Sequence, residues 1–190
     1  MYLPKIASYE IREHFSNCDL STVSTEGRLM AVNDKFLAMY WKNNSEIVIV
    51  DSSKPLTIKD NLSRIKGLSN ILDLEFSPFN NNILASCDNG NKGNSVLLWK
   101  IPENGLHENL TKEILSYNHH TKKVNFVNFN PVVSDLICSG ALSGEIHVWN
   151  MIKGDKFMEL KADDTPTLVT WSPNGVLIGV TTKKKNYKYI

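Results

Sequence analysis

Cysteine is scarce in this sequence, and long apolar runs are absent. The three cysteines, Cys18, Cys87 and Cys138, form no CxxC pair among the 190 residues. This pattern indicates free thiols in a reducing compartment rather than a disulfide scaffold. No window approaches the roughly 18 apolar residues that span a bilayer, and the first residues lack the apolar core of a signal peptide. We therefore expect a cytoplasmic chain without a membrane span.

A strong net charge is also missing. The chain carries 21 Lys and Arg against 20 Asp and Glu, a formal net charge of +1. Because nucleic-acid binding rests on a field of positive charge, we expect no nucleic-acid partner. Hydrophobic residues make up 42% of the sequence and charged residues 22%, which is typical of a globular protein with its own core.

The residue patterns of common active sites are lacking as well. There is no G-x-S-x-G, and the glycine-containing stretch 90–94 lacks the Lys-Ser/Thr ending of a phosphate-binding loop. A zinc site at His119 and His120 would need three or four ligands at defined spacing, and the sequence shows no such cluster. His147 alternates with apolar neighbours, which predicts a strand residue that faces solvent. We expect no catalytic residue, no metal and no cofactor.

What the sequence does contain is a repeat. Short apolar runs recur that end in an aromatic residue, then Ser or Asn, then Pro; the aromatic residues are Phe76, Phe129 and Trp171. Ten residues after each aromatic stands a hydroxyl residue, namely Ser86, Ser139 and Thr181. The next run ends in Trp99 in the first unit and in Trp149 in the second. Such runs, separated by Asn, Gly and Pro, are typical of strands joined by turns.

The units contain three to four strands each and recur every ~40–50 residues, as the blades of a β-propeller do. The sequence therefore predicts an all-β WD-repeat propeller of about four blades, over residues 9–60, 66–102, 117–152 and 160–190. Four blades are at the small limit of closed propellers. Two architectures remain open on this basis, a small closed ring and an incomplete part of a larger propeller.

Residues 119–151 resemble a WD repeat best. In WD repeats, a His near the blade start, a Ser or Thr of the second strand, an Asp in the next turn and a Trp form a buried hydrogen-bond network. The resemblance assigns the first, second and last of these roles to His120, Ser139 and Trp149, while Ser143 stands at the place of the acid. In the preceding unit, Leu68 stands at the His position. A missing acid removes a charge-assisted hydrogen bond, so we expect incomplete networks.

Several stretches resemble the coronin family more specifically. The residues after Trp99 read KIPENGL, and coronins typically have V-W-Q/K-I-P-E-N-G-L at this point. AVNDKFLAMYW at 31–41, HHTKKV at 119–124 and YEIREHF at 9–15 are similar to further family motifs. The resemblance covers nearly the whole chain. It implies the first half of a seven-bladed propeller, and it gives this chain no counterpart of the family's later blades or of its coiled coil.

The resemblance also implies a function. Coronins bind filamentous actin, so we expect a non-enzymatic protein of the actin cytoskeleton. The candidate contact residues are Arg12, Arg28, Lys122 and Lys123, of which Arg28 is the one basic residue within 19–29. A further basic turn at 183–185 is either a solvated turn or a contact for an acidic partner.

An alternative function is a diverged WD-repeat scaffold that serves another protein complex and has lost actin binding. Other protein partners and the oligomeric state stay open. An open half-propeller leaves strand edges and apolar faces without neighbours, and this predicts self-association or a bound partner.

Overall fold

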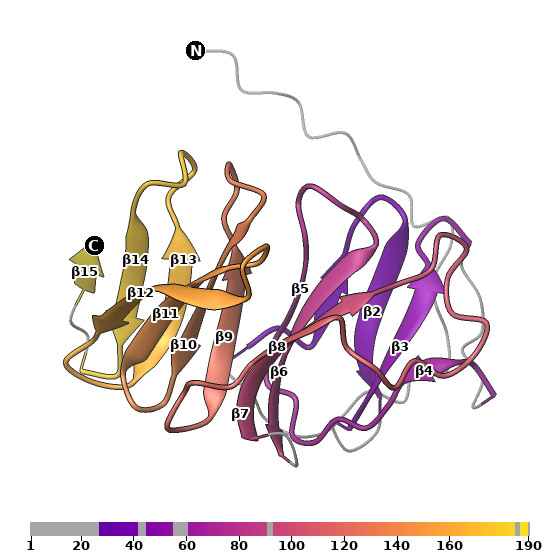
Figure 1. The fold of residues 1–190 in the computed structure, drawn as a ribbon, viewed down its shortest axis with the longest axis horizontal. Helices are drawn as coiled ribbons and strands as arrows, with labels where there is room; N and C mark the ends of the chain where they lie inside the picture. Colours follow the sequence, from indigo (N-terminus) through magenta and orange to yellow (C-terminus); the bar gives the residue numbers. More distant parts are fainter. Residues whose placement is uncertain (1–26, 42–44, 55–60, 91–92, 185–186, 190) are drawn as a thin grey trace, which may run out of the picture.

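The computed structural model describes residues 27–41, 45–54, 61–90, 93–184 and 187–189. Within them the chain forms fifteen β-strands. The strands make four antiparallel sheets, each a meander in which strands adjacent in sequence pair with one another. The sheets lie side by side in chain order (Figure 1). In the described part of the chain, no helix has the length and apolar character to cross a membrane.

The bounds of the strands are as follows. The first sheet contains β1 (Met30–Val32), β2 (Phe36–Trp41), β3 (Glu46–Asp51) and β4 (Arg64–Ile65). The second contains β5 (Leu74–Phe76), β6 (Ile83–Gly90), β7 (Gly93–Lys100) and β8 (Leu115–Tyr117). The third contains β9 (Val124–Phe129), β10 (Leu136–Ala141), β11 (Glu145–Asn150) and β12 (Asp155–Lys161). The fourth contains β13 (Pro166–Trp171), β14 (Ile178–Thr182) and β15 (Tyr187–Tyr189).

Each repeated aromatic residue is the last residue of the first strand of its sheet. Phe76 ends β5, Phe129 ends β9 and Trp171 ends β13. A proline follows two residues later in every case. Because proline has no amide hydrogen to donate to a neighbouring strand, it ends the ladder there. The sequence motif therefore marks the point at which the chain leaves the first strand and turns back.

The sheets are offset from the units that the repeats define. The outer strands β4, β8 and β12 lie past the ends of units 9–60, 66–102 and 117–152. Two of them are only two or three residues long, and β12 is exposed at six of its seven positions. Short or exposed strands carry little apolar pattern, so the repeats report the inner three strands of a sheet.

Three of the four hydrophobic clusters lie between neighbouring sheets, and the fourth lies within the first sheet. One cluster joins the first and second sheets and includes Tyr40 and Trp99. A second joins the second and third sheets around Trp149, and a third joins the third and fourth sheets around Phe126 and Val169. These five side chains are at most 3% exposed. Each sheet is thus stabilised by apolar contacts with its neighbours in chain order.

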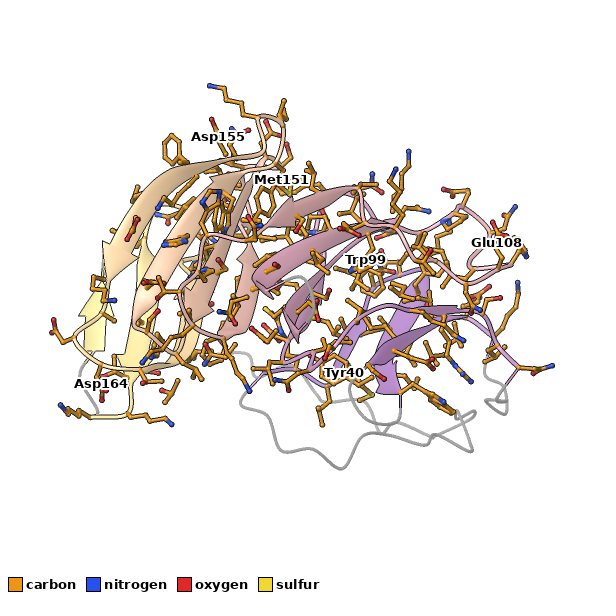
Figure 2. The ribbon with its side chains drawn as sticks, turned by 60° about the horizontal axis from the view of Figure 1, so that its bottom comes forward. Tyr40, Trp99, Glu108, Met151, Asp155 and Asp164 are labelled. Atoms are coloured by element: carbon orange, nitrogen blue, oxygen red, sulfur yellow. The ribbon has the colours of Figure 1, made fainter. Side chains whose placement is uncertain are left out.

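The meander places alternate loops at opposite ends of the sheets. One end carries the loops 118–123, 142–144 and 162–165 and the turn that contains Lys183 and Lys184; we call this end the lysine rim. Backbone hydrogen bonds join its neighbouring loops, from Leu142 N to Lys123 O at 2.9 Å and from Lys183 N to Thr165 O at 3.1 Å. The loops 101–114 and 151–154 lie at the other end. Figure 2 shows the two ends through Asp164 and Asp155.

Candidate functional site

A buried hydroxyl, Ser139 of β10, lies at the centre of a polar network in the third sheet. Trp149 of β11 donates a hydrogen bond from Nε1 to Ser139 Oγ at 2.8 Å, and His120 Nε2 lies 2.7 Å from the same oxygen. All three residues are buried. Because the indole can only donate, Ser139 Oγ accepts from Trp149, and the hydroxyl can either donate to His120 Nε2 or accept from it, according to the tautomer of His120. The structure thus brings together the three residues that the WD-repeat resemblance names.

The second sheet repeats part of this network. Trp99 Nε1 donates to Ser86 Oγ at 2.9 Å, and both residues are fully buried. Leu68, at the position that corresponds to His120, packs in the apolar cluster between the first two sheets. The serine–tryptophan pair is therefore common to two sheets, whereas the histidine is particular to the third.

The third sheet contains an acid that the sequence motif did not place. Glu145, the first residue of β11, accepts hydrogen bonds from Thr121 N at 3.1 Å and from Thr121 Oγ1 at 2.7 Å. Its Oε2 lies 3.6 Å from His120 Nδ1. Burial alone would raise the pKa of Glu145, but the hydrogen bonds from Thr121 and the nearby charge of Lys161 contribute to a net lowering of the pKa to about 2. Glu145 thus supplies the negative charge that Ser143 lacks. In the sequence, the acid directly after Ser143-Gly144 was the feature from which this role could have been predicted.

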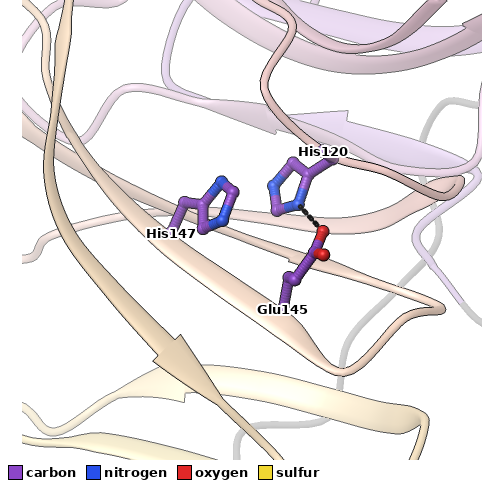
Figure 3. Close-up of side chains that lie close together, drawn as sticks. All are labelled: His120, Glu145 and His147. Atoms are coloured by element: carbon purple, nitrogen blue, oxygen red, sulfur yellow. Dashed lines mark ion pairs between the residues drawn. The ribbon is translucent and has the colours of Figure 1, made fainter.

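His147 is buried, and the prediction that it faces solvent is wrong. Its side chain is 1% exposed, and its ring stacks on that of His120 with centroids 4.1 Å apart and planes 8° apart. Burial lowers the pKa of His120 to about 3 and also lowers the pKa of His147, so both imidazoles are neutral at pH 7. Figure 3 shows the two rings beside Glu145. One ligand atom of each residue lies within 4.8 Å of the others. The sequence shows no such cluster, and the fold brings its three members together.

Arg28, one of the candidate filament contacts, is used inside the molecule. Its Nη2 donates to Asp73 Oδ2 at 2.8 Å, its Nε to Asp73 Oδ1 at 2.9 Å and its Nη1 to Glu75 Oε1 at 2.7 Å. The two carboxylates also accept the backbone amides of Val127 and Phe129 in β9, at 2.9 Å and 2.6 Å. The guanidinium therefore links the segment before β1 to the second and third sheets.

The other candidate contacts differ in their placement. Lys122 and Lys123 are exposed in the loop before β9, and Lys183 and Lys184 are exposed at the same end of the fourth sheet. Arg12 lies outside the described residues. The structure thus places two lysine pairs on the lysine rim and separates them from the internal contacts of Arg28.

Comparison with known proteins adds independent information. No family model matches the chain. A coronin-like protein of Schizosaccharomyces pombe is 22% identical over 181 residues, which are 92% of this chain and 30% of that protein. Human Coronin-2B is 32% identical over 108 residues, 55% of this chain and 22% of that protein. The crystal structure of the WD40 domain of Toxoplasma gondii coronin matches with a TM-score of 0.86 and 28% identity, over 94% of this chain and 46% of that one.

Four meander sheets with apolar cores between them, and a fold shared with a solved WD40 domain, define a WD-repeat β-propeller protein. The predicted fold class is confirmed. The similarity to the coronin family is confirmed as well: the relatives and the solved WD40 domain that the chain matches are coronins or coronin-like proteins. It spans less than half the length of each of these three relatives, and its sheets correspond to part of a larger propeller.

Proposed function

We propose that this chain binds filamentous actin in the cytoplasm, and that it acts as a binding surface and not as an enzyme. The similarity to coronins supports the proposal. So do the IPENGL and HHTKKV stretches, which resemble motifs of a family that binds actin filaments.

The observation that carries the proposal is the exposed lysine pair on the lysine rim. Among the residues that the structure describes, no acid forms an ion pair with Lys122 or Lys123. The rim also holds Asp163 and Asp164, in the loop between the third and fourth sheets. Exposed lysines of this kind attract an acidic partner surface and raise its rate of association.

Co-sedimentation with actin filaments tests the proposal. The 190-residue chain is spun with and without filaments at two salt concentrations, and the variant Lys122→Glu/Lys123→Glu is compared with it. We expect saturable pelleting that needs filaments and weakens at higher salt, because salt screens contacts between exposed charges. The double variant should bind at least tenfold more weakly, since it replaces two attractive charges by two repulsive ones.

A matched control comes from the opposite end of the sheets. Lys112 and Lys153 are exposed there in the loops 101–114 and 151–154. The variant Lys112→Glu/Lys153→Glu makes the same change in net charge and should bind filaments as the wild type does. Equal losses in both double variants would mean that only net charge matters and that the lysine rim is not the contact.

The second candidate function is that of a scaffold for another protein complex. The internal use of Arg28 favours it, because the basic residue of the segment 19–29 is bonded to Asp73 and Glu75. Soluble protein that never pellets with filaments, at either salt concentration, would contradict actin binding by this chain. The scaffold function would then be the remaining candidate.

A further inference from the structure

Two imidazoles and a carboxylate lie close together in the third sheet (Figure 3). Glu145 and His147 stand two residues apart on β11 and so share one face of the sheet, and His120 reaches them from the loop before β9. Their ligand atoms lie within 4.8 Å of one another. The side chains of His120, Glu145 and His147 are 0%, 11% and 1% exposed.

Three buried ring nitrogens of this cluster have no hydrogen-bond partner: His120 Nδ1 and both nitrogens of His147. Nearly all buried polar atoms of native proteins are bonded, so three such atoms side by side call for a physical explanation. A neutral imidazole offers one lone pair in the plane of its ring, and this lone pair is the usual nitrogen ligand of transition metals.

We propose that His120 Nδ1, a ring nitrogen of His147 and the carboxylate of Glu145 bind one divalent transition-metal ion. Two imidazoles and one carboxylate form a known zinc-binding combination, and Zn²⁺ accepts three protein ligands with a fourth position for water or a further side chain. The inference stands on the geometry of the third sheet and does not depend on actin binding.

The spacing of the ligand atoms suits zinc after one side-chain movement. Ligands of tetrahedral zinc lie about 3.3 Å from one another, and His120 Nδ1 and Glu145 Oε2 are already 3.6 Å apart. The lone pairs of stacked rings lie in parallel planes, here with centroids 4.1 Å apart, so one ring must turn for both to point at the same ion. His147 is the ring that can turn, because neither of its nitrogens would lose a hydrogen bond.

The surroundings hold the other two ligands in place. Ser139 Oγ accepts from Trp149 and has a second lone pair, which can accept from His120 Nε2–H while Nδ1 binds the metal. Thr121 fixes the Glu145 carboxylate through two hydrogen bonds. Outer contacts of this kind orient ligands and strengthen metal binding.

The outer strand β12 adds a carboxylate and two positive charges. Glu159 Oε2 lies 3.8 Å from His147 Nε2, and its side chain is half exposed, which makes it a candidate fourth ligand at the solvent side. Lys156 pairs with Glu159, and Lys161 lies 3.8 Å from Glu145 Oε1. A bound cation would displace these ammonium groups, so Lys156→Ala should tighten metal binding.

A bound metal ion would link the loop 118–123, through His120, to Glu145 and His147 of β11. That loop carries Lys122 and Lys123 immediately after His120. Because metal binds only the folded arrangement of the three ligands, binding should also raise the unfolding temperature of the chain.

Titration of the chelator-treated 190-residue chain with Zn²⁺ alone, followed by calorimetry, tests the proposal. We expect one equivalent to saturate the wild type and a higher Tm in its presence. Addition of Co²⁺ should give the visible d–d absorption of a tetrahedral site. His147→Phe keeps a ring stacked on His120 but removes both nitrogens, and it should weaken Zn²⁺ binding by ~100-fold or more, since even outer-contact changes cost about 10–100-fold.

The control variant is His119→Ala, which removes the exposed neighbouring imidazole and leaves the cluster intact. It should bind Zn²⁺ as the wild type does. Circular dichroism of His147→Phe establishes that the variant is folded, and Glu145→Gln provides a second loss-of-ligand variant. Absence of saturable binding in the wild type, or binding that His147→Phe retains and His119→Ala loses, would overturn the proposal.

Discussion

Arg28 lies where the segment before β1 meets the second and third sheets, so its removal tests how the sheets are held together. Arg28→Met keeps most of the alkyl chain and removes the guanidinium. The side chain of Asp73 is 2% exposed and would lose both guanidinium donors, while it keeps the amide donors Val127 N at 2.9 Å and the backbone nitrogen of residue 28 at 2.8 Å. Glu75 would lose its guanidinium partner too, and burial already raises its pKa.

The expected loss of stability follows from these contacts. Removing one partner of a fully buried ion pair costs about 3–5 kcal/mol, because the other charge stays buried. The Arg28 side chain is 39% exposed, so water replaces part of the lost interaction. We therefore expect the free energy of unfolding to fall by about 2–3 kcal/mol, a large share of the ~5–15 kcal/mol of a typical domain.

Urea unfolding followed by tryptophan fluorescence measures this loss, and Lys54→Met is the control. Lys54 pairs with Asp51 at the surface, where the side chains are 77% and 38% exposed, and such pairs contribute less than ~1 kcal/mol. In the Arg28→Met background, Asp73→Asn should cost less than it does in the wild type, since the carboxylate is then already without its counter-charge. An Arg28→Met variant as stable as Lys54→Met would refute the reasoning.

Two further predictions concern the third sheet. Burial lowers the pKa of His120 to about 3 in the folded chain, whereas an unfolded chain has the ordinary histidine pKa of about 6.5. Between pH 7 and pH 5 this imidazole is therefore protonated in the unfolded chain only, and in EDTA the free energy of unfolding should fall by about 2 kcal/mol. A urea midpoint that is unchanged at pH 5, or an equal loss in His120→Asn, would contradict this. Gly144 has φ +87° and a Cβ there would lie 2.8 Å from Ala162 O, whereas Gly154, with φ +72°, has open space. Gly144→Ala should therefore lower Tm more than Gly154→Ala does; equal shifts would show that the close approach is tolerated.

Part of this fold could be predicted because its signals are local. The aromatic residue before Ser-Pro or Asn-Pro marks the end of β5, β9 and β13, since proline interrupts a ladder wherever it stands. The serine and tryptophan that pair in the third sheet, Ser139 and Trp149, lie on adjacent strands only 10 residues apart. A short spacing of this kind is visible in the sequence as a repeat, and the repeat led to the prediction of a propeller.

The role of Arg28 could not be predicted, because its partners are distant in the chain. Asp73 lies 45 residues away and Val127 lies 99 residues away. A basic residue read by itself suggests a surface contact, and only the packing of one sheet against the next shows that its charge is neutralised inside the molecule.

The sequence by itself determined the inner strands of the sheets and the positions of the paired serine and tryptophan, because these depend on residues close together in the chain. The tertiary structure alone decided which polar residues are buried. His147 alternates with apolar neighbours as a solvent-facing strand residue does, but β11 is an interior strand and the stacked His120 ring covers that face. Alternation of apolar and polar residues distinguishes a solvent-facing from a core-facing position only where one face of the sheet is exposed to water. At β11 both faces are covered.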